Sequence, residues 1–324
     1  MFRSFFICLF IIVLATTCLA AVDPSTVSLS YLAGKKFDGR YLTLVKVLAE
    51  EISYTRYYIT YKSGDLTISG IMNVPKGKGP YPVIITNHGY INTRYYTTGR
   101  GLKREQDYLA QRGYVVLHPD YRNHNGSSKD PDNDFRLYTG YIEDVINAVY
   151  AVKSSNLKFI DKDNIGMLGH SLGGGIALSI MAVKPKLIKA CVLFAPTSID
   201  YKDNFERWIA RRPPQVEESI VQKYGPPPVR HKIIEKYGTP DTNPNFWNGL
   251  SVRSRINYIS DPVIVHQGTS DDSVPFEWSE KLETALKAAG KDITLYLYKG
   301  EGHEFSAAWP TVMKTSEAFF RKHL

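Results

Sequence analysis

The chain has 324 residues, of which 43% are hydrophobic and 22% charged, and a formal net charge of +8. This composition is ordinary for a globular protein and excludes extended disorder, and the length suffices for one large α/β domain or two small ones. The basic excess is mild and forms no dense lysine and arginine block. We therefore expect a solvated basic surface and no nucleic-acid partner.

Residues 1–20 predict a signal peptide. Arg3 gives a positive start, residues 5–15 form an apolar run, and small residues follow, with cleavage expected after Ala20. The run is too short to span a bilayer comfortably, so we expect no stable membrane insertion and a secreted or periplasmic protein. A lipid anchor on Cys18 is less favoured, because the residue three positions before it is not the leucine that such signals prefer.

Cleavage after residue 20 would leave Cys191 as the one cysteine of the mature chain. No disulfide can then form within that chain, so an exported protein of this sequence must depend on its hydrophobic core. Cys191 lies in the apolar run of residues 190–194, which predicts a buried small hydrophobic residue.

The segment before residue 51 gives only a weak signal for secondary structure. Residues 22–50 show mixed helical periodicity, and we expect them to wrap around the body of the domain. Residues 55–62 and 66–75 then alternate aromatic and β-branched residues on both sides of a glycine-containing turn, which predicts an antiparallel hairpin.

Strands and helices alternate through most of the remaining chain. Continuous apolar runs predict buried strands, and periodic runs predict helices between them. The expected strands are 82–87, 114–120, 165–168, 190–194, 261–268 and 292–298, and the expected helices are 102–111, 134–154, 172–182, 277–289 and 309–322. This alternation predicts an α/β fold with a mostly parallel sheet, helices on both faces and ligands at the carboxyl ends of the strands.

The regular alternation is interrupted between about 197 and 258, where proline-rich stretches separate short helical pieces. The interruption is long for a plain loop and short for a second domain. We therefore expect one domain over residues 21–324, with a small cap insertion over the active site that is lined in part by Trp208, Phe246 and Trp247. Peripheral helices without substrate contact are the alternative.

Residues 165–175 carry the strongest motif, a strand, a tight corner and an immediate helix. Gly169 and Gly173 bracket Ser171 as G-x-S-x-G, a spacing in which only small residues let strand and helix approach so closely. The corner holds the serine hydroxyl above the sheet, over the N-terminus of a helix. This context predicts a nucleophile rather than an ordinary turn.

A serine nucleophile needs a base to take its proton, and the base needs a partner that fixes its tautomer. On this kind of sheet the partners follow in the order serine, acid, histidine. Asp271 and Asp272 lie just past the strand at 261–268, and Asp271 is the favoured acid. His303, in a glycine-flanked loop past the last strand, is the predicted base.

The oxyanion of the reaction needs two N–H donors. We predict the backbone N–H of Leu172, directly after the nucleophile, and that of Tyr90, in the loop after the strand at 82–87. His88 ends that strand and is expected to position the loop rather than act as the base. His170 lies inside the corner, where its side chain must point away from that of Ser171.

No metal site is expected. His118 and His124 lie near Asp120, but their spacing matches no known pattern of metal ligands. Asp130, Asp132 and Asp134 alternate like a calcium loop yet lack its glycine and its glutamate, so a solvated loop is predicted.

Three motifs in order, residues 169–174, 266–275 and 302–303, resemble the catalytic domain of the prolyl oligopeptidase (S9) serine peptidases. The dienelactone-hydrolase and acyl-esterase branches of the α/β-hydrolase superfamily are also similar, and the likeness covers roughly residues 55–324. The resemblance implies an α/β-hydrolase fold with a nucleophile, acid and base at Ser171, Asp271 and His303. It also implies an acyl-enzyme mechanism on small peptide or ester substrates without a cofactor.

Two features depart from the peptidase pattern. About 50 residues of mature chain precede the hairpin, too few for the β-propeller of full-length prolyl oligopeptidases, and His88 stands where several members have a tyrosine. A serine peptidase and a carboxylesterase therefore both stay open, and an inactive hydrolase-like binding protein is the third hypothesis. The sequence leaves the oligomeric state open.

Overall fold

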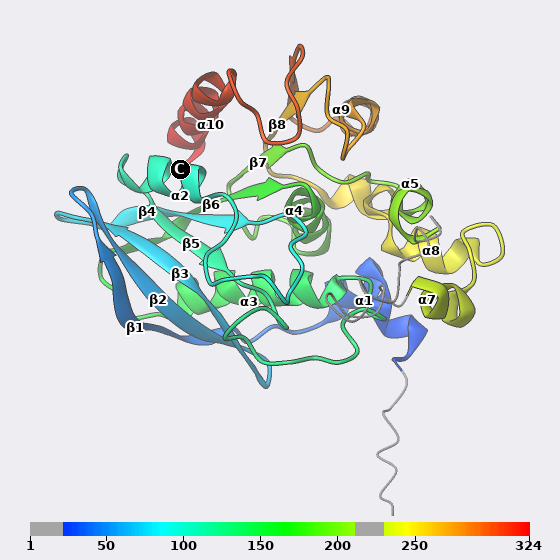
Figure 1. Ribbon diagram of the computed structural model, residues 1–324, viewed down its shortest axis with the longest axis horizontal. Helices are drawn as coiled ribbons and strands as arrows, with labels where there is room; N and C mark the ends of the chain where they lie inside the picture. The colour runs from blue at the N-terminus through cyan, green and yellow to red at the C-terminus, as the bar shows by residue number, and fades with distance from the viewer. Residues whose placement is uncertain (1–21, 211–229) are drawn as a thin grey trace, which may run out of the picture.

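The computed structural model describes residues 22–210 and 230–324, so the predicted signal peptide and part of the predicted cap lie outside the described residues. The described strands form one nine-stranded sheet in the order β1-β2-β3-β5-β4-β6-β7-β8-β9 (Figure 1). They are β1 (Arg40–Glu50), β2 (Tyr54–Ser63), β3 (Leu66–Pro75), β4 (Tyr81–Asn87), β5 (Val115–Pro119), β6 (Ile160–His170), β7 (Ala190–Phe194), β8 (Val263–Gly268) and β9 (Ile293–Tyr298).

The sheet is mostly parallel, as the sequence predicts. Strands β4 to β9 pair in parallel, and β3 pairs antiparallel with β5. The expected hairpin is β2 and β3, which pair without a register shift from Tyr54↔Pro75 to Ser63↔Leu66. Because β4 and β6 to β9 run in one direction, the loops after them meet at one edge of the sheet.

The prediction for residues 22–50 is wrong in its second half. A 3₁₀ helix, η1 (Pro24–Val27), and the short helix α1 (Leu29–Gly34) come first, but residues 40–50 form the edge strand β1. Three register shifts interrupt its pairing with β2. These irregularities break the two-residue alternation of a strand, so the pattern of apolar residues resembles a weak helix.

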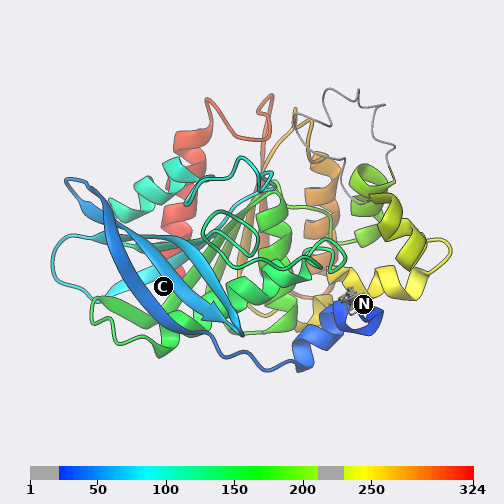
Figure 2. The same cartoon turned by 60° about the horizontal axis from the view of Figure 1, so that its bottom comes forward.

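Helices cover both faces of the sheet (Figure 2). Helices α3 (Thr139–Ser154), α4 (Leu172–Val183) and α9 (Phe276–Ala288) contribute to one core, which also holds Val263 and Val265 of β8. Helices α2 (Lys103–Ala110) and α10 (Trp309–His323) contribute to a second core with Ile264. The alternation of neighbouring β8 side chains between two cores is the pattern of a strand buried on both faces.

Helix α3 starts five residues later than predicted. Leu137 and Tyr138 have φ angles of 50° and 66°, in the left-handed region. A right-handed helix cannot pass through such residues, so the turn before Thr139 is separate from α3. This turn places side chains of residues 137–142 beside the cavity described below.

Short helical pieces follow β7, where the cap is predicted. They are α5 (Tyr201–Asn204), the π-helix η2 (Phe205–Ile209), α7 (Arg230–Tyr237), α8 (Pro244–Leu250) and η3 (Val252–Tyr258). All of these pieces except η3 contribute to a third small core, whose members include Val22 and Val27 from the start of the described chain as well as Trp247 and Tyr237. The first described residues and the cap therefore pack as one unit.

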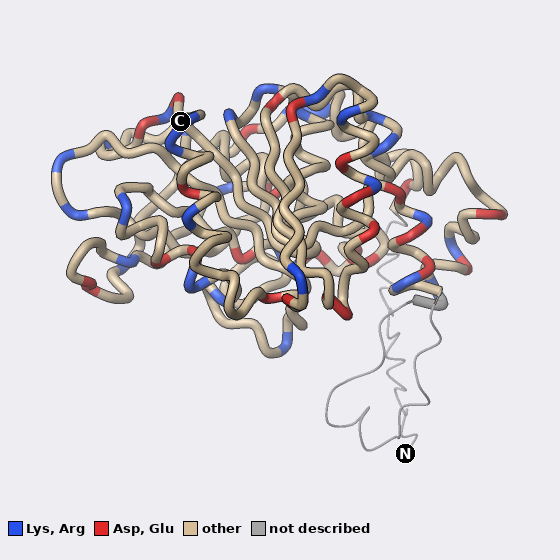
Figure 3. Tube along the Cα trace, turned by 90° about the horizontal axis from the view of Figure 1, so that it is seen from above, with Lys and Arg blue, Asp and Glu red and all other residues tan. Residues whose placement is uncertain are grey.

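Cys191 is a free, buried thiol, and burial raises its pKa. In the view of Figure 3, basic and acidic residues are interspersed over the described chain. Among the described residues no helix is both long and apolar enough to cross a membrane.

Candidate active site

Ser171 sits at the corner between β6 and α4, with φ 55° and ψ −121°. This conformation is strained for a residue with a side chain, and it matches the sharp strand-to-helix turn that the motif predicts. The flanking glycines are sterically required. A Cβ on Gly173 would lie 2.1 Å from the carbonyl oxygen of Asn87, and one on Gly169 would lie 2.4 Å from that of Gly173.

Asp271 lies in the loop after β8 with both carboxylate oxygens occupied. Its Oδ1 accepts the N–H groups of Ser273 at 2.9 Å and Val274 at 2.8 Å, and its Oδ2 accepts Gln267 Nε2 at 3.0 Å. Oδ2 also lies 2.8 Å from Nδ1 of His303. Burial raises the pKa of Asp271, but the hydrogen bonds from His303, Val274 and Ser273 outweigh it and hold the pKa below its ordinary value.

The structure pairs His303 with Asp271 and not with Asp272. The carboxylate of Asp272 accepts the hydroxyl of Ser273, and its carbonyl oxygen accepts a hydrogen bond from Arg207. A histidine whose Nδ1 donates to a carboxylate carries its acceptor on Nε2, which is the tautomer that a general base needs. Ser171 and His303 line the same cavity.

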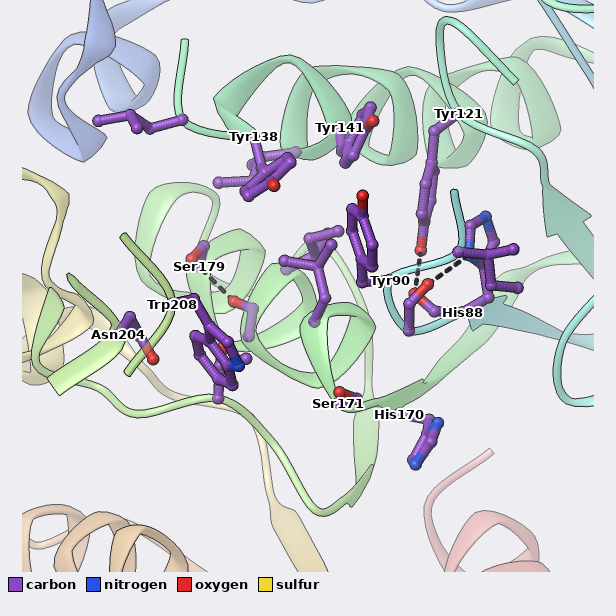
Figure 4. Close-up of a pocket in the computed structure, with 18 of the residues that line it drawn as sticks. His88, Tyr90, Tyr121, Tyr138, Tyr141, His170, Ser171, Ser179, Asn204 and Trp208 are labelled. Carbon is purple, nitrogen blue, oxygen red and sulfur yellow. Dashed lines mark hydrogen bonds between the residues drawn. The ribbon is translucent and has the colours of Figure 1, made fainter. Parts of the chain in front are cut away.

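His170 contacts the predicted base, which the sequence did not suggest. Its side chain and that of Ser171 leave the corner in different directions, as expected (Figure 4). The ring centroids of His170 and His303 are 4.4 Å apart, and His170 Nε2 lies 3.0 Å from the carbonyl oxygen of His303. Burial, followed by the nearby His303, lowers the pKa of His170 to about 4, so its ring is neutral at pH 7 and donates from Nε2.

The two predicted oxyanion donors belong to residues that line the cavity together with Ser171. Leu172 is the first residue of α4, and N–H groups in the first turn of a helix have no acceptor within the helix. Tyr90 lies in the loop after β4 and lines the cavity. That loop passes close to the nucleophile, because a Cβ on Gly89 would lie 3.1 Å from the Cβ of Ser171.

His88 is buried beneath this loop. Its ring stacks on Tyr121 at 4.2 Å and on Tyr96 at 4.9 Å, and its Nδ1 lies 2.7 Å from the carbonyl oxygen of Gly89. Burial lowers its pKa well below the ordinary value. Asp120 holds the far side of the loop by accepting the Tyr96 hydroxyl at 2.7 Å and the Gly99 N–H at 2.9 Å. His88 thus has the contacts of a positioning residue.

His118 and His124 belong to the same aromatic cluster. Within the part of the chain that the structure describes, no group of three or more histidine, cysteine, aspartate or glutamate side chains is arranged to hold a metal ion.

A cavity of about 750 Å³ opens at Ser171. Its lining comes from the loop after β4, the start of α3, one face of α4, the cap and the His303 loop. Trp208 lines it as predicted, but the prediction is wrong for Phe246 and Trp247, which pack in the small core of the cap. Tyr138 and Tyr141 of the α3 region also line it, and no local sequence signal marks them because their approach depends on tertiary packing.

Comparison with known proteins agrees with this geometry. A family model described as the alpha/beta hydrolase fold matches residues 82–243, and one for the prolyl oligopeptidase family matches residues 229–324. Dipeptidyl aminopeptidase BIII of Pseudoxanthomonas mexicana is 25% identical over 240 residues, which cover 72% of this chain and 32% of that protein. The chain therefore spans about a third of the length of this relative.

Two solved structures share the fold at 18% identity. Acetyl xylan esterase 1 from Thermoanaerobacterium sp. matches with a TM-score of 0.64 over 93% of this chain and 94% of that one. Dipeptidyl peptidase 4 of Porphyromonas gingivalis matches with a TM-score of 0.61 over 89% of this chain and 36% of that one. The predicted fold and the predicted resemblance are confirmed, and the predicted enzyme class, a serine hydrolase, agrees with these relatives. The chain belongs to the α/β-hydrolase fold family.

Proposed function

We propose that the chain is a serine hydrolase that cleaves peptide or ester bonds through an acyl-enzyme. His303 removes the proton of Ser171 as the serine attacks the carbonyl carbon, and Asp271 stabilises the imidazolium. The N–H groups of Leu172 and Tyr90 donate to the developing oxyanion. His303 then protonates the leaving group, and a water molecule that it deprotonates releases the acyl group. The supporting observation is the 2.8 Å contact of His303 with Asp271, beside a cavity that Ser171 also lines.

Two substrate classes fit this mechanism. A peptidase acting on short peptides is supported by the prolyl oligopeptidase family match, which includes residues 271 and 303. A carboxylesterase acting on small esters is supported by the cavity, whose lining includes several aliphatic side chains beside its polar ones. Hydrolysis of p-nitrophenyl acetate compared with that of short chromogenic peptides would decide between them.

Labelling with a fluorophosphonate probe tests the mechanism itself. The wild-type chain should be labelled and the Ser171→Ala variant should not. Ser154→Ala is the matched control, because Ser154 is an exposed helical serine that does not line the cavity. A wild-type chain that stays unlabelled and inactive would favour the hydrolase-like binding protein instead.

We also propose that the chain is exported and that residues 21–324 form one catalytic domain, with 197–258 as the cap. The export proposal is supported by the charge and apolar pattern of residues 1–20. N-terminal sequencing of the mature protein should begin at Ala21. A lipidated start at Cys18 would support the anchored form, and an intact start upstream of Cys18 would overturn both cleavage hypotheses.

A further inference from the structure

One face of α4 forms the floor of the cavity beyond the nucleophile. Leu172, Gly175, Ile176 and Ser179 line it, and their spacing of three and four residues places them on one side of the helix. With a rise of 1.5 Å per residue, Ser179 lies about 12 Å along the helix axis from Ser171. Figure 4 shows the two serines at opposite ends of this stretch. We call the part of the cavity along this face the α4 arm.

Besides Tyr138 and Tyr141, the opposite walls of the α4 arm carry aliphatic side chains from separate parts of the chain. They belong to the α3 region and to the cap, and comprise Leu137, Ile142, Ile209, Ile233, Leu250 and Val252. Trp208 adds an aromatic face from the cap (Figure 4). An apolar group that enters the arm therefore leaves water for apolar surroundings on several sides.

Several polar side chains along the α4 arm are already hydrogen-bonded to the protein, although the hydroxyl of Thr197, which lies beside Gly175, is not among them. These contacts are Ser179 Oγ to the Gly175 carbonyl at 2.8 Å, Tyr201 OH to the Leu137 carbonyl at 3.4 Å, Asn204 Nδ2 to the Ser198 carbonyl at 3.0 Å, and Thr139 Oγ1 to the Arg136 carbonyl at 2.7 Å. A polar substrate group would exchange its hydrogen bonds with water for few new ones here. The arm thus disfavours sugar and peptide groups.

The charged side chains of the cavity lie on its exposed part. Arg94, Asp134 and Glu304 are the arginine, aspartate and glutamate residues in its lining, and all three are exposed. Arg94 and Glu304 lie in the loops that also carry Tyr90 and His303, whereas Asp134 lies just before the α3 region. We call the part of the cavity formed by these two loops the charged mouth.

We propose that the α4 arm binds the acyl part of the substrate, and that this acyl part is an unbranched apolar chain of medium length. The proposal names the substrate class of the site and rests on the proposed role of Ser171 as the nucleophile. The ester carbonyl lies at Ser171, the chain runs along Ile176 toward Ser179, and the leaving group lies toward the charged mouth. Each methylene that enters the arm should raise kcat/KM by about fourfold, until the chain end reaches Ser179.

The test is hydrolysis of p-nitrophenyl esters from acetate through butyrate, hexanoate, octanoate and decanoate to dodecanoate. For the wild-type chain, kcat/KM should rise over the first members, pass through a maximum and then level off or fall. Ser179→Leu fills the far end of the arm. It should lower the ratio of kcat/KM on the optimal ester to that on acetate by at least about tenfold and move the maximum to a shorter chain.

Ser154→Leu is the matched control. Like Ser179, Ser154 is a helical serine whose hydroxyl contacts a backbone carbonyl in the preceding turn, here that of Ala151 at 3.3 Å, and it also contacts the Gly39 carbonyl at 3.2 Å. Unlike Ser179, it lies outside the cavity. Its chain-length profile should equal that of the wild type. If Ser179→Leu fails to fold, the smaller Ser179→Val and the wild-type series itself carry the test.

The outcomes separate the two proposals. A flat profile, or a maximum at acetate, in a chain that the fluorophosphonate probe labels would overturn the acyl-chain inference and leave the hydrolase proposal standing. An unchanged profile in both Ser179 variants would do the same. Absence of labelling together with absence of hydrolysis on every ester and peptide would instead overturn the proposed function.

Discussion

Replacing Asp271 with asparagine tests the proposed acid most sharply. The carboxylate accepts four donors, two backbone N–H groups on Oδ1 and the side chains of Gln267 and His303 on Oδ2. In Asp271→Asn one of these oxygens becomes an NH₂ group that accepts nothing. An NH₂ at the Oδ1 position would leave both backbone donors without an acceptor. An NH₂ at the Oδ2 position removes one acceptor of Gln267 Nε2, which also donates to the carbonyl oxygens of Gly268 and Val274. If His303 changes its tautomer to accept, this orientation therefore costs less.

In that tautomer His303 cannot act as the general base. When Nδ1 of His303 accepts a hydrogen bond from the new amide group, the ring proton moves to Nε2, and Nε2 can no longer take the proton of Ser171. A wrong tautomer at an otherwise intact triad lowers kcat by about 10⁴. This loss corresponds to about 5 kcal/mol in the activation free energy.

The assay is kcat on the best ester at neutral pH, with Asp272→Asn as the matched control. Asp272 carries the same side chain one residue away but accepts only the Ser273 hydroxyl among the contacts of its carboxylate. The control should keep kcat within about threefold of the wild type, as expected for a surface substitution. If Asp271→Asn lowers kcat only slightly, or if Asp272→Asn lowers kcat more than Asp271→Asn does, the assignment of Asp271 as the acid is refuted.

Three further predictions concern a glycine, an oxyanion donor and a buried histidine. Gly173→Ala should lower the unfolding free energy by about 3 kcal/mol or more, because its Cβ would lie 2.1 Å from the Asn87 carbonyl oxygen. Gly34→Ala, whose Cβ would have nothing within 4 Å, should be neutral, and equal melting midpoints of the two variants would contradict the steric argument. Tyr90→Pro removes the proposed oxyanion donor and should lower kcat by about 100-fold to 1000-fold, while Tyr90→Ala, which keeps the N–H, should not; equal rates for both variants would exclude this donor. Burial lowers the pKa of His118 from 6.5 to about 3, so the unfolded chain binds a proton that the folded chain does not, and stability is full above about pH 6.5 and falls as the pH drops toward 3. Urea titrations across that range give the unfolding free energy at each pH. Its slope against pH should be smaller in His118→Gln than in the wild type by about 1.4 kcal/mol per pH unit, and an unchanged slope would mean that His118 is not buried as a neutral ring.

The elements that sequence patterns predict are those with strong local signals. Most of the strands from β4 to β9 contain a continuous apolar run, and the helices between them have clear periodicity, so their order and the parallel sheet follow from local rules. The first five residues of β6 and the exposed side chains of β9 depart from this pattern. The sequence does not indicate the edge strand β1, because its register shifts against β2 remove the alternation. The predicted start of α3 is five residues too early, because nothing local in the sequence indicates that Leu137 and Tyr138 adopt left-handed conformations.

For the candidate site, chain order and glycine spacing single out Ser171, Asp271 and His303, and the structure brings the last two into contact. The contact of His170 with His303 joins residues 133 apart in sequence, and no local pattern encodes such a distance. Similarly, an aromatic residue in the cap can line the cavity, as Trp208 does, or pack inside the cap, as Trp247 does. Composition cannot separate these outcomes, because both bury the ring.

The small core shared by the cap and the first described residues bears on how the protein should be produced. Val22 and Val27 pack in the same cluster as Trp247, more than 200 residues later in the chain, and the cap elements of that cluster also supply Ile233 and Leu250 to the α4 arm. A purification tag joined just ahead of Val22 would therefore be tethered to the elements that form the proposed acyl-binding arm. The C-terminal helix α10 packs on the other face of the sheet, with α2, so a tag placed after Leu324 is the better choice for enzyme assays (Figure 2).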